Sequence, residues 1–170
     1  MKTKNTKKVA FIGLSIALAM ILSFVESQIP SIVPIYGQYG IKIGLPNLVM
    51  VFLLYRVGWK ETVMVSIIRI LLMAMLFPNA FAFVLSISGA ILSLAVMILL
   101  KKTNLFSCIT ISIAGGAFHN IGQITAACFL TETAQIAYYL PVLLISGTLA
   151  GTLIGVVSGL LVKRLDKFKF

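Results

Sequence analysis

The sequence predicts an all-α integral membrane protein, with one domain over residues 1–170 folded as a bundle of six transmembrane helices and both termini in the cytoplasm. Three observations support this prediction. Apolar residues make up 60% of the chain and charged residues 11%, against roughly 45–50% and 25% in a typical soluble domain. The apolar residues form long runs, and about 20 such residues span a bilayer as a helix. The basic residues lie at the ends of these runs.

The first predicted helix covers residues 9–25 and the second covers residues 41–57. The first run follows a basic start, but it is too long for the apolar region of a signal peptide and no cleavage site follows it. Pro46 falls in the first turn of the second helix, where proline is tolerated. The outer loop over residues 26–40 contains two prolines, two glycines and two tyrosines. This composition predicts either a lid over an outer cavity or a loop anchored by its tyrosines at the membrane surface.

Four further apolar runs predict the remaining helices. A Pro78-Asn79 turn separates the third run from the fourth. Paired basic residues end the fourth and the sixth runs. The predicted helices cover residues 59–77, 80–100, 105–130 and 134–162.

The distribution of charge orients these helices. If the N-terminus is cytoplasmic, 12 of the 14 lysine and arginine residues fall in four inner segments, which are residues 1–8, about 56–60, 101–104 and 163–170. This excess follows the positive-inside rule, and it accounts for the net charge of +10. Basic and aromatic residues do not interleave as they do in a nucleic-acid groove. We therefore expect a multi-pass protein of a bacterial cell membrane, in contact with the lipid bilayer and with no nucleic-acid partner.

Small residues mark two helices for close packing. Gly147, Gly151, Gly155 and Gly159 recur every four residues on the sixth predicted helix, so another helix can approach that stripe closely. The partner helix can belong to this chain or to another protein. On the first helix, small residues form one face with Gly13 and Ala17 and a neighbouring face with Ser15, Ala19 and Ser23. Such faces can dock a partner subunit or pack within the chain.

Polar residues at membrane depth are costly and therefore candidates for function. Arg69 lies ten residues into the third helix, about 15 Å along it, so it must face the interior of the bundle. There it can bind an anionic ligand, or it can satisfy helix carbonyls and a structural acid. On the fifth helix, His119 and Gln123 share a face and Asn120 lies beside it. This cluster predicts a ligand-binding wall, and the alternative is hydrogen bonding between helices.

Near the outer face, Lys42 and Asn47 flank the start of the second helix, and Glu26 ends the first. The positive end of the second helix points at this region. Together with Arg69 and Lys42, it favours an anionic or strongly polar substrate, although Glu26 can cancel one charge. The predicted substrate-binding residues are Lys42, Asn47, Arg69, His119, Asn120 and Gln123.

Several catalytic and cofactor motifs are missing from the sequence. It has no Walker A motif for ATP. Asp166 is the only aspartate, and the three glutamates are scattered, so no carboxylate cluster is present for magnesium and a diphosphate. Cys108 and Cys128 lie about 30 Å apart along one predicted helix and cannot pair. We expect a protein that is not an enzyme on its own and that binds no metal or cofactor.

Five segments resemble a known bacterial family, which is labelled heptaprenyl diphosphate synthase component I and also called the Gx transporter family. They are Phe24-Val-Glu-Ser27, Gly40-Ile-Lys-Ile-Gly-Leu-Pro-Asn47, Gly58-Trp-Lys-Glu61, Arg69 and Gly116-Ala-Phe-His-Asn-Ile-Gly-Gln123. The resemblance covers nearly the whole chain, from about Val9 to Leu165, and departs at Pro46, where the family favours alanine.

The resemblance implies the fold of a substrate-binding S component of energy-coupling factor (ECF) transporters. Such a protein has six helices, a small-residue first helix and an outer-loop lid. It works with a transmembrane coupling subunit and two cytosolic ATPases, and the resemblance implies that Gly13 and Ala17 dock the coupling subunit. The synthase label implies instead a membrane accessory to heptaprenyl diphosphate or quinone synthesis, although the aspartate-rich motifs of prenyl synthases are absent. A structural membrane protein without a ligand is the third possibility.

The charge count predicts which side of the membrane the segment around Asn104 faces. A cysteine introduced at Asn104, in a background lacking Cys108 and Cys128, should react with a membrane-permeant thiol reagent and be protected from an impermeant one in intact cells. The reason is that Lys101 and Lys102 hold this segment inside. Labelling by the impermeant reagent would reverse the predicted orientation.

Overall fold

The structure is a computed structural model that describes residues 2–29, 34–36, 39–40 and 44–165. In this part of the chain the helices are α1 (Lys2–Gln28), α2 (Asn47–Arg56), α3 (Trp59–Leu76), α4 (Ala80–Thr103), α5 (Cys108–Thr131) and α6 (Leu140–Arg164). A 3-10 helix, η1 (Ala134–Tyr139), precedes α6. Two short antiparallel strands, β1 (Pro34–Tyr36) and β2 (Tyr39–Gly40), pair within the predicted outer loop.

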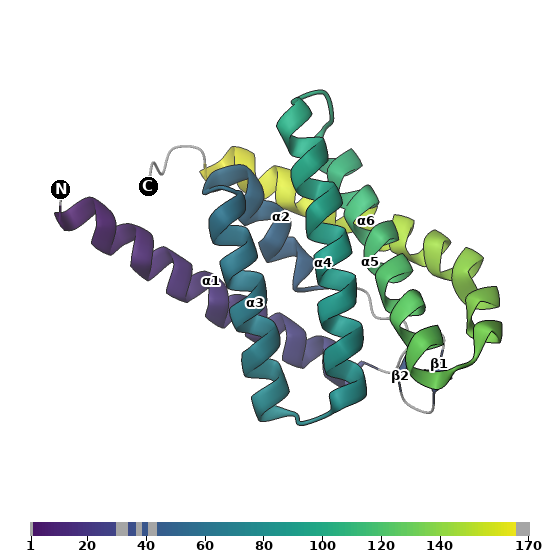
Figure 1. Cartoon of the computed structure of the whole chain (residues 1–170). Coiled ribbons are helices and arrows are strands. Elements are labelled where there is room, and N and C mark those ends of the chain that lie inside the picture. The colour runs from purple at the N-terminus through teal and green to yellow at the C-terminus, as the bar shows by residue number, and fades with distance from the viewer. Residues whose placement is uncertain (1, 30–33, 37–38, 41–43, 166–170) are drawn as a thin grey trace.

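The helices pack in an order that places α5 between α4 and α6. Figure 1 shows α4, α5 and α6 side by side, with α3 next to α4 and α1 crossing at the edge of the bundle. Helix α1 packs mainly on α3, and its N-terminal half extends away from the other helices. The bundle therefore has a tightly packed side formed by α4, α5 and α6 and a more open side formed by α1 and α3.

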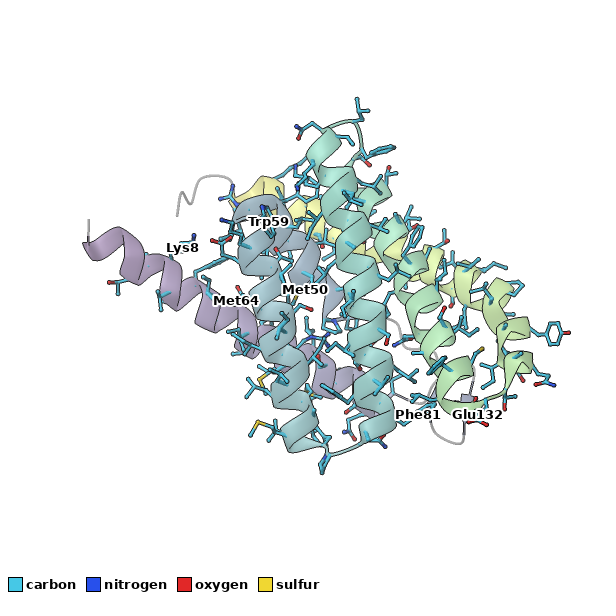
Figure 2. The ribbon with its side chains drawn as sticks, in the orientation of Figure 1. Lys8, Met50, Trp59, Met64, Phe81 and Glu132 are labelled. Carbon is cyan, nitrogen blue, oxygen red and sulfur yellow. The ribbon has the colours of Figure 1, made fainter. Side chains whose placement is uncertain are left out.

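Helix α2 is the buried centre of the bundle. Six consecutive residues, from Val49 to Leu54, are buried on it, so the helix is enclosed on all sides. It packs against α6 and α3 and also contacts α1 and α5. Figure 2 shows Met50 within the bundle, between the end that carries Lys8 and Trp59 and the end that carries Phe81 and Glu132.

Local sequence explains where the helices begin and end. The side chain of Asn79 accepts a hydrogen bond from the Ala82 N–H at 2.9 Å, and Ser107 accepts one from the Thr110 N–H at 3.1 Å, so both residues cap the helices that follow. Asn104 and Glu132 end α4 and α5 in the left-handed conformation, with φ of 56° and 51°.

The second predicted helix, residues 41–57, was wrong in length. Helix α2 begins at Asn47, because Gly44 has a φ of 83° and Pro46 lacks the N–H of a helix interior. Residues 41–43 lie outside the described part of the chain. Ten helical residues extend about 15 Å, half of a hydrocarbon core of about 30 Å.

Three segments of the described chain are long and apolar enough to cross a membrane, and these are Thr6–Gln28, Ala80–Thr103 and Ala134–Arg164. The chain is therefore a helical membrane protein. Helices α3 and α5 also have 18 and 24 residues, but they carry the charged and polar residues singled out above. The sixth predicted helix, residues 134–162, begins as η1, and α6 follows with Pro141 in its first turn.

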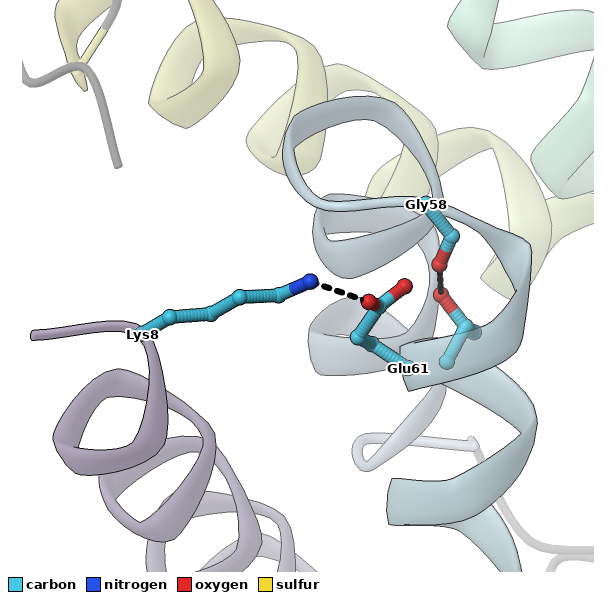
Figure 3. Close-up of polar contacts among 4 residues, drawn as sticks. Lys8, Gly58 and Glu61 are labelled. Atoms are coloured by element: carbon cyan, nitrogen blue, oxygen red, sulfur yellow. Dashed lines mark hydrogen bonds and ion pairs between the residues drawn. The ribbon is translucent and has the colours of Figure 1, made fainter. Parts of the chain in front are cut away.

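The four predicted inner segments meet at one end of the molecule. Lys8 donates a hydrogen bond to Glu61 at 2.5 Å, which joins α1 to the start of α3 (Figure 3). The Arg56 guanidinium donates to the Leu165 carbonyl at 2.6 Å. The Lys102 ammonium lies 5.8 Å from the centre of the Trp59 ring. The described residues Lys8, Arg56 and Lys102 therefore lie at the same end of the bundle, in agreement with the predicted grouping of basic segments.

Glycines bring the backbones of α5 and α6 into direct contact. A Cβ atom at Gly151 would lie 2.7 Å from both the Ile113 Cα and the Ser112 carbonyl oxygen. At Gly155 it would lie 2.7 Å from the Ile109 Cα. The glycine stripe of α6 thus has its partner helix within the chain, and this resolves one alternative left open by the sequence.

The seam between α5 and α6 predicts a difference between two glycines of one helix. Gly151→Ala should lower the free energy of unfolding by about 1–3 kcal/mol, because the added methyl group overpacks the contact. Gly159→Ala is the matched control, since its Cβ would lie 3.9 Å from the Cys108 Cβ, an ordinary contact distance. Thermal unfolding of the detergent-solubilised protein measures both, and equal stabilities of the two variants would contradict the seam.

Candidate functional site

The structure places four of the six predicted site residues on the linings of two cavities. Arg69 lines a large cavity, whereas Asn47, His119 and Asn120 line a small one. Gln123 lies beside His119, where both side chains contact Gly89 of α4. Lys42 lies outside the described residues.

The large cavity has a volume of about 720 Å³ and lies where the end of α1, the last two turns of α3 and the start of α4 meet. This volume lies within the range of small-molecule sites, which is about 300–1,000 Å³. Its lining is mixed: Ser27, Gln28, Arg69, Asn79 and Ser86 are polar, and Ile29, Ile70, Met73, Ala74, Leu76, Phe77, Pro78, Ala82 and Phe83 are apolar. An apolar wall with a few polar groups is the usual composition of a ligand pocket.

Arg69 is buried at the α1–α3 contact, as the sequence predicts. Thr62, Ser66 and Arg69 form one buried face of α3, and Arg69 is 9% exposed. One guanidinium nitrogen, Nη1, donates to the Ser23 hydroxyl at 3.1 Å, and Ser23 donates in turn to the Ala19 carbonyl at 2.8 Å. The buried Nε has no hydrogen-bond partner. Arg69 is therefore positioned by α1, and part of its donor capacity is not satisfied by the protein.

Glu26 is the site residue that the sequence left without a role. Its carboxylate accepts hydrogen bonds from the N–H groups of Gly44 and Leu45, the second at 3.2 Å. It also acts electrostatically on the Arg69 guanidinium. The sequence predicted that the positive end of α2 would attract an anionic substrate. In the structure the Glu26 carboxylate takes that position. Burial at 7% exposure distinguishes Glu26 from the other described acids, Glu61 and Glu132, and sequence alone does not reveal that burial.

The small cavity, between α2, α4, α5 and α6, has room for about one water molecule, because its volume is about 20 Å³. Asn47 and His119 line it, and the buried Nδ1 of His119 has no hydrogen-bond partner. Asn120 donates from Nδ2 to the Leu143 carbonyl at 2.6 Å, so its amide group holds α6 against α5. This cavity is too small for a vitamin-sized molecule.

The two cavities follow one face of α4. Ser86, Gly89 and Ser93 are separated by three and four residues and therefore share that face. Ser86 lines the large cavity and Ser93 lines the small one. A Cβ at Gly89 would lie 2.8 Å from His119 Cε1, so the histidine fills the space between them. Because the Arg69 charge also acts on His119, the predicted residues form two neighbouring groups rather than one wall.

Comparison with known protein families gives one match. The family described as heptaprenyl diphosphate synthase component I matches residues 11–161, which is nearly the whole chain. No curated protein and no solved structure matches the chain. The resemblance drawn from the five sequence segments is confirmed.

The arrangement around Glu26 predicts that its charge stabilises the fold. Glu26→Gln keeps the length of the side chain but weakens its bonds to the Gly44 and Leu45 amides and removes its attraction to Arg69. We expect the free energy of unfolding to fall by about 1–3 kcal/mol. Glu132→Gln is the control, because Glu132 is exposed and an exposed substitution costs within about 0.5 kcal/mol. Equal unfolding midpoints for the two variants would contradict a structural role for Glu26.

Proposed function

We propose that this chain, which belongs to the heptaprenyl diphosphate synthase component I family, is the substrate-binding membrane subunit of an ECF-type uptake transporter for a small polar or vitamin-like molecule. The observation that carries this proposal is the large cavity with the buried Arg69 on its lining. A cavity of this size, half enclosed by helices of a membrane protein, suits the capture of a small solute better than it suits a purely structural role.

The residues proposed to serve the substrate are those brought near this cavity. Arg69 lines it, and His119 and Gln123 of α5 lie against Gly89 on the face of α4 that also carries Ser86 of the cavity lining. Asn47 and Asn120 border the small cavity beyond them, and Lys42 stays a prediction from the sequence alone. A charged residue at membrane depth is a functional candidate by default.

The face of α1 that carries Gly13 and Ala17 supports a docking role. Both residues are exposed, and a Cβ at Gly13 would meet no atom within 4 Å. The neighbouring face with Ser15, Ala19 and Ser23 is buried against the rest of the chain. One small-residue face is thus used internally and the other is left uncovered, where a coupling subunit can approach closely.

The proposed assembly includes a transmembrane coupling subunit and two cytosolic ATPases in a bacterial plasma membrane. In it the chain spans the membrane six times with both termini in the cytoplasm. The basic end formed by the four inner segments supports this orientation. The absence of a Walker A motif agrees with it, because the ATPases supply the energy.

The family description favours a second function, as a membrane accessory to heptaprenyl diphosphate or quinone synthesis. In that case the partner is a soluble prenyl synthase. The described part of the chain has no group of three histidine, cysteine, aspartate or glutamate residues that could hold a metal ion. The catalytic carboxylates for a diphosphate substrate would then belong to the partner.

Capture of partners from native membranes tests the proposal. The affinity-tagged chain should retain two ATPases and a membrane subunit, which mass spectrometry identifies by sequence. Gly13→Leu together with Ala17→Leu should abolish their retention, because leucine blocks close helix approach. The fold should survive, because both positions are exposed. Exchange of the two residues, Gly13→Ala with Ala17→Gly, keeps both positions small and should retain the partners.

One result would count against uptake and another against the docking role of α1. Retention of a prenyl synthase without ATPases would support the synthesis role instead. Equal retention of the ATPases by the double leucine variant would remove the α1 face from the assembly.

A further inference from the structure

We propose that the large cavity binds an amphipathic monoanion, a molecule with one carboxylate or phosphodiester group on an apolar body, and that Arg69 contacts its anionic group. This inference deepens the proposed function, on which it rests for its role in uptake, by naming the chemical class of the captured molecule. It follows from the charge of the cavity, the shape of its lining and the state of the Arg69 donors.

Arg69 supplies the charge that recognises the ligand. Among the described residues that line the cavity it is the one with a charged side chain. Its guanidinium presents five N–H donors in a planar fork that matches the oxygens of carboxylates and phosphates. Ser23 accepts from Nη1, and the buried Nε has no partner. A ligand oxygen can therefore take up donor capacity that the protein leaves unused.

Glu26 is buried three residues after Ser23, the residue of α1 that bonds to Arg69, so a negative charge of the chain itself already lies on this side of the guanidinium and favours a ligand with a single negative charge. Its carboxylate acts electrostatically on Arg69, so the pair presents less than a full positive charge to the cavity. A ligand with several negative charges, such as a diphosphate, would bring more negative charge into the cavity than the one arginine of its described lining can compensate. A cationic ligand would meet the guanidinium directly, and a neutral one would leave the free donor unpaired.

The apolar residues of the lining match a ligand with an apolar body, and the position of Arg69 determines which way the ligand is oriented. Phe77, the residue that follows α3, comes eight residues after Arg69, about 12 Å further along the helix axis. Met73, Phe77 and Phe83 provide apolar surface over this length. The amide side chains of Gln28 and Asn79 lie at the other end, next to the end of α1 and the start of α4. The anionic group would therefore lie beside Arg69, with the apolar body extending towards Phe77 and Asn79.

Four probes that share one alkyl chain and differ only in the head group test the class. They are octanoate, octanol, octyltrimethylammonium and octyl phosphate. The full chain is placed in nanodiscs of zwitterionic phosphatidylcholine, and binding is measured by calorimetry with empty nanodiscs subtracted. We expect octanoate to bind about tenfold or more tightly than octanol and octyltrimethylammonium. Octyl phosphate, which is largely dianionic at neutral pH, should not bind more tightly than octanoate.

Substitutions test whether the preference for octanoate over octanol arises in the large cavity. Arg69→Gln should remove the preference for octanoate over octanol, and Arg69→Lys should restore part of it. Arg164→Gln is the matched control, since Arg164 is exposed and its loss removes the same charge outside the cavity. Ala82→Phe fills the cavity and leaves Arg69 in place, so it tests the site even where an Arg69 variant fails to fold. It should weaken octanoate binding about tenfold.

Nanodiscs of anionic phosphatidylglycerol separate the two sources of the ligand. If the natural ligand is a lipid phosphodiester, this lipid should compete with octanoate, and the Arg164→Gln variant should show the same competition. If the ligand is a free carboxylate, moving from phosphatidylcholine to phosphatidylglycerol should lower octanoate affinity only through the negative surface charge of the lipid. The Ala82→Phe variant, whose cavity is filled, measures that surface effect, and the wild-type chain should show the same fold-change. Both results are consistent with a monoanion site.

Three results would overturn the inference: equal binding of octanol, tighter binding of octyl phosphate, or unchanged octanoate affinity in a folded Ala82→Phe variant. Failure of the transport proposal has a different signature. If octanoate binds as expected and the tagged chain retains no ATPases, the site stands and the uptake function falls. If the ATPases are retained and octanoate does not bind, the ligand class is wrong and the function stands.

Discussion

Without Cβ atoms at Gly116, Gly147 and Gly151, the backbones of α5 and α6 touch, and the arrangement of the other helices depends on that contact. Lipid chains are as apolar as leucine, so helices in a bilayer gain little from burying apolar surface and associate through close packing instead. The same device acts between α4 and α5, where a Cβ at Gly122 would lie 2.6 Å from the Ser88 carbonyl oxygen. The three helices therefore form a rigid side of the bundle, against which α2 is enclosed.

The open side of the bundle is built differently. Helix α1 makes polar contacts with α3 in addition to apolar ones, with Ser23 and Glu26 acting on Arg69, Lys8 bound to Glu61, and Phe24 stacked on Phe77. Polar contacts of this kind can be broken and remade more readily than a glycine seam. A cavity on this side can thus admit a ligand without disturbing the packed side. The large cavity lies on the α1 and α3 side, which is packed less closely than the side formed by α4, α5 and α6.

Sequence reasoning predicted the parts of the fold that depend on periodicity and charge. Long apolar runs predicted α3, α4 and α5 to within three residues, whereas α1 begins seven residues before the predicted start, within the basic segment. The charge pattern predicted which of the described segments share an end. The length of α2 was not predicted, because the apolar run gives no sign that Gly44 adopts a positive φ, which interrupts the helix. The burial of Arg69 followed from its depth in the run. Its separation from Asn47 and Asn120 did not, since helix neighbours cannot be read from a single sequence.

The position of Glu26 also lay beyond sequence reasoning. An acid after an apolar run is usually a residue of the membrane surface, and only the return of the chain at Gly44 brings backbone amides to its carboxylate. The glycines of α6 gave a clear signal for close packing, but not for the helix they contact. Both the surroundings of Glu26 and the helix that packs on the α6 glycines depend on contacts between segments far apart in the sequence. Local sequence preference does not reveal such contacts.

The short length of α2, ten residues, determines how deep in the membrane the turn before it lies. If Arg56 marks the inner surface, the turn that precedes Asn47 lies about 15 Å below it, near the middle of the hydrocarbon. Peptide groups at that depth cannot bond to water, and they must be satisfied by the protein. The Glu26 carboxylate meets that need for two of them. Because α2 is enclosed by the other helices, this turn meets protein rather than lipid, and α2 ends inside the bundle instead of at a membrane surface.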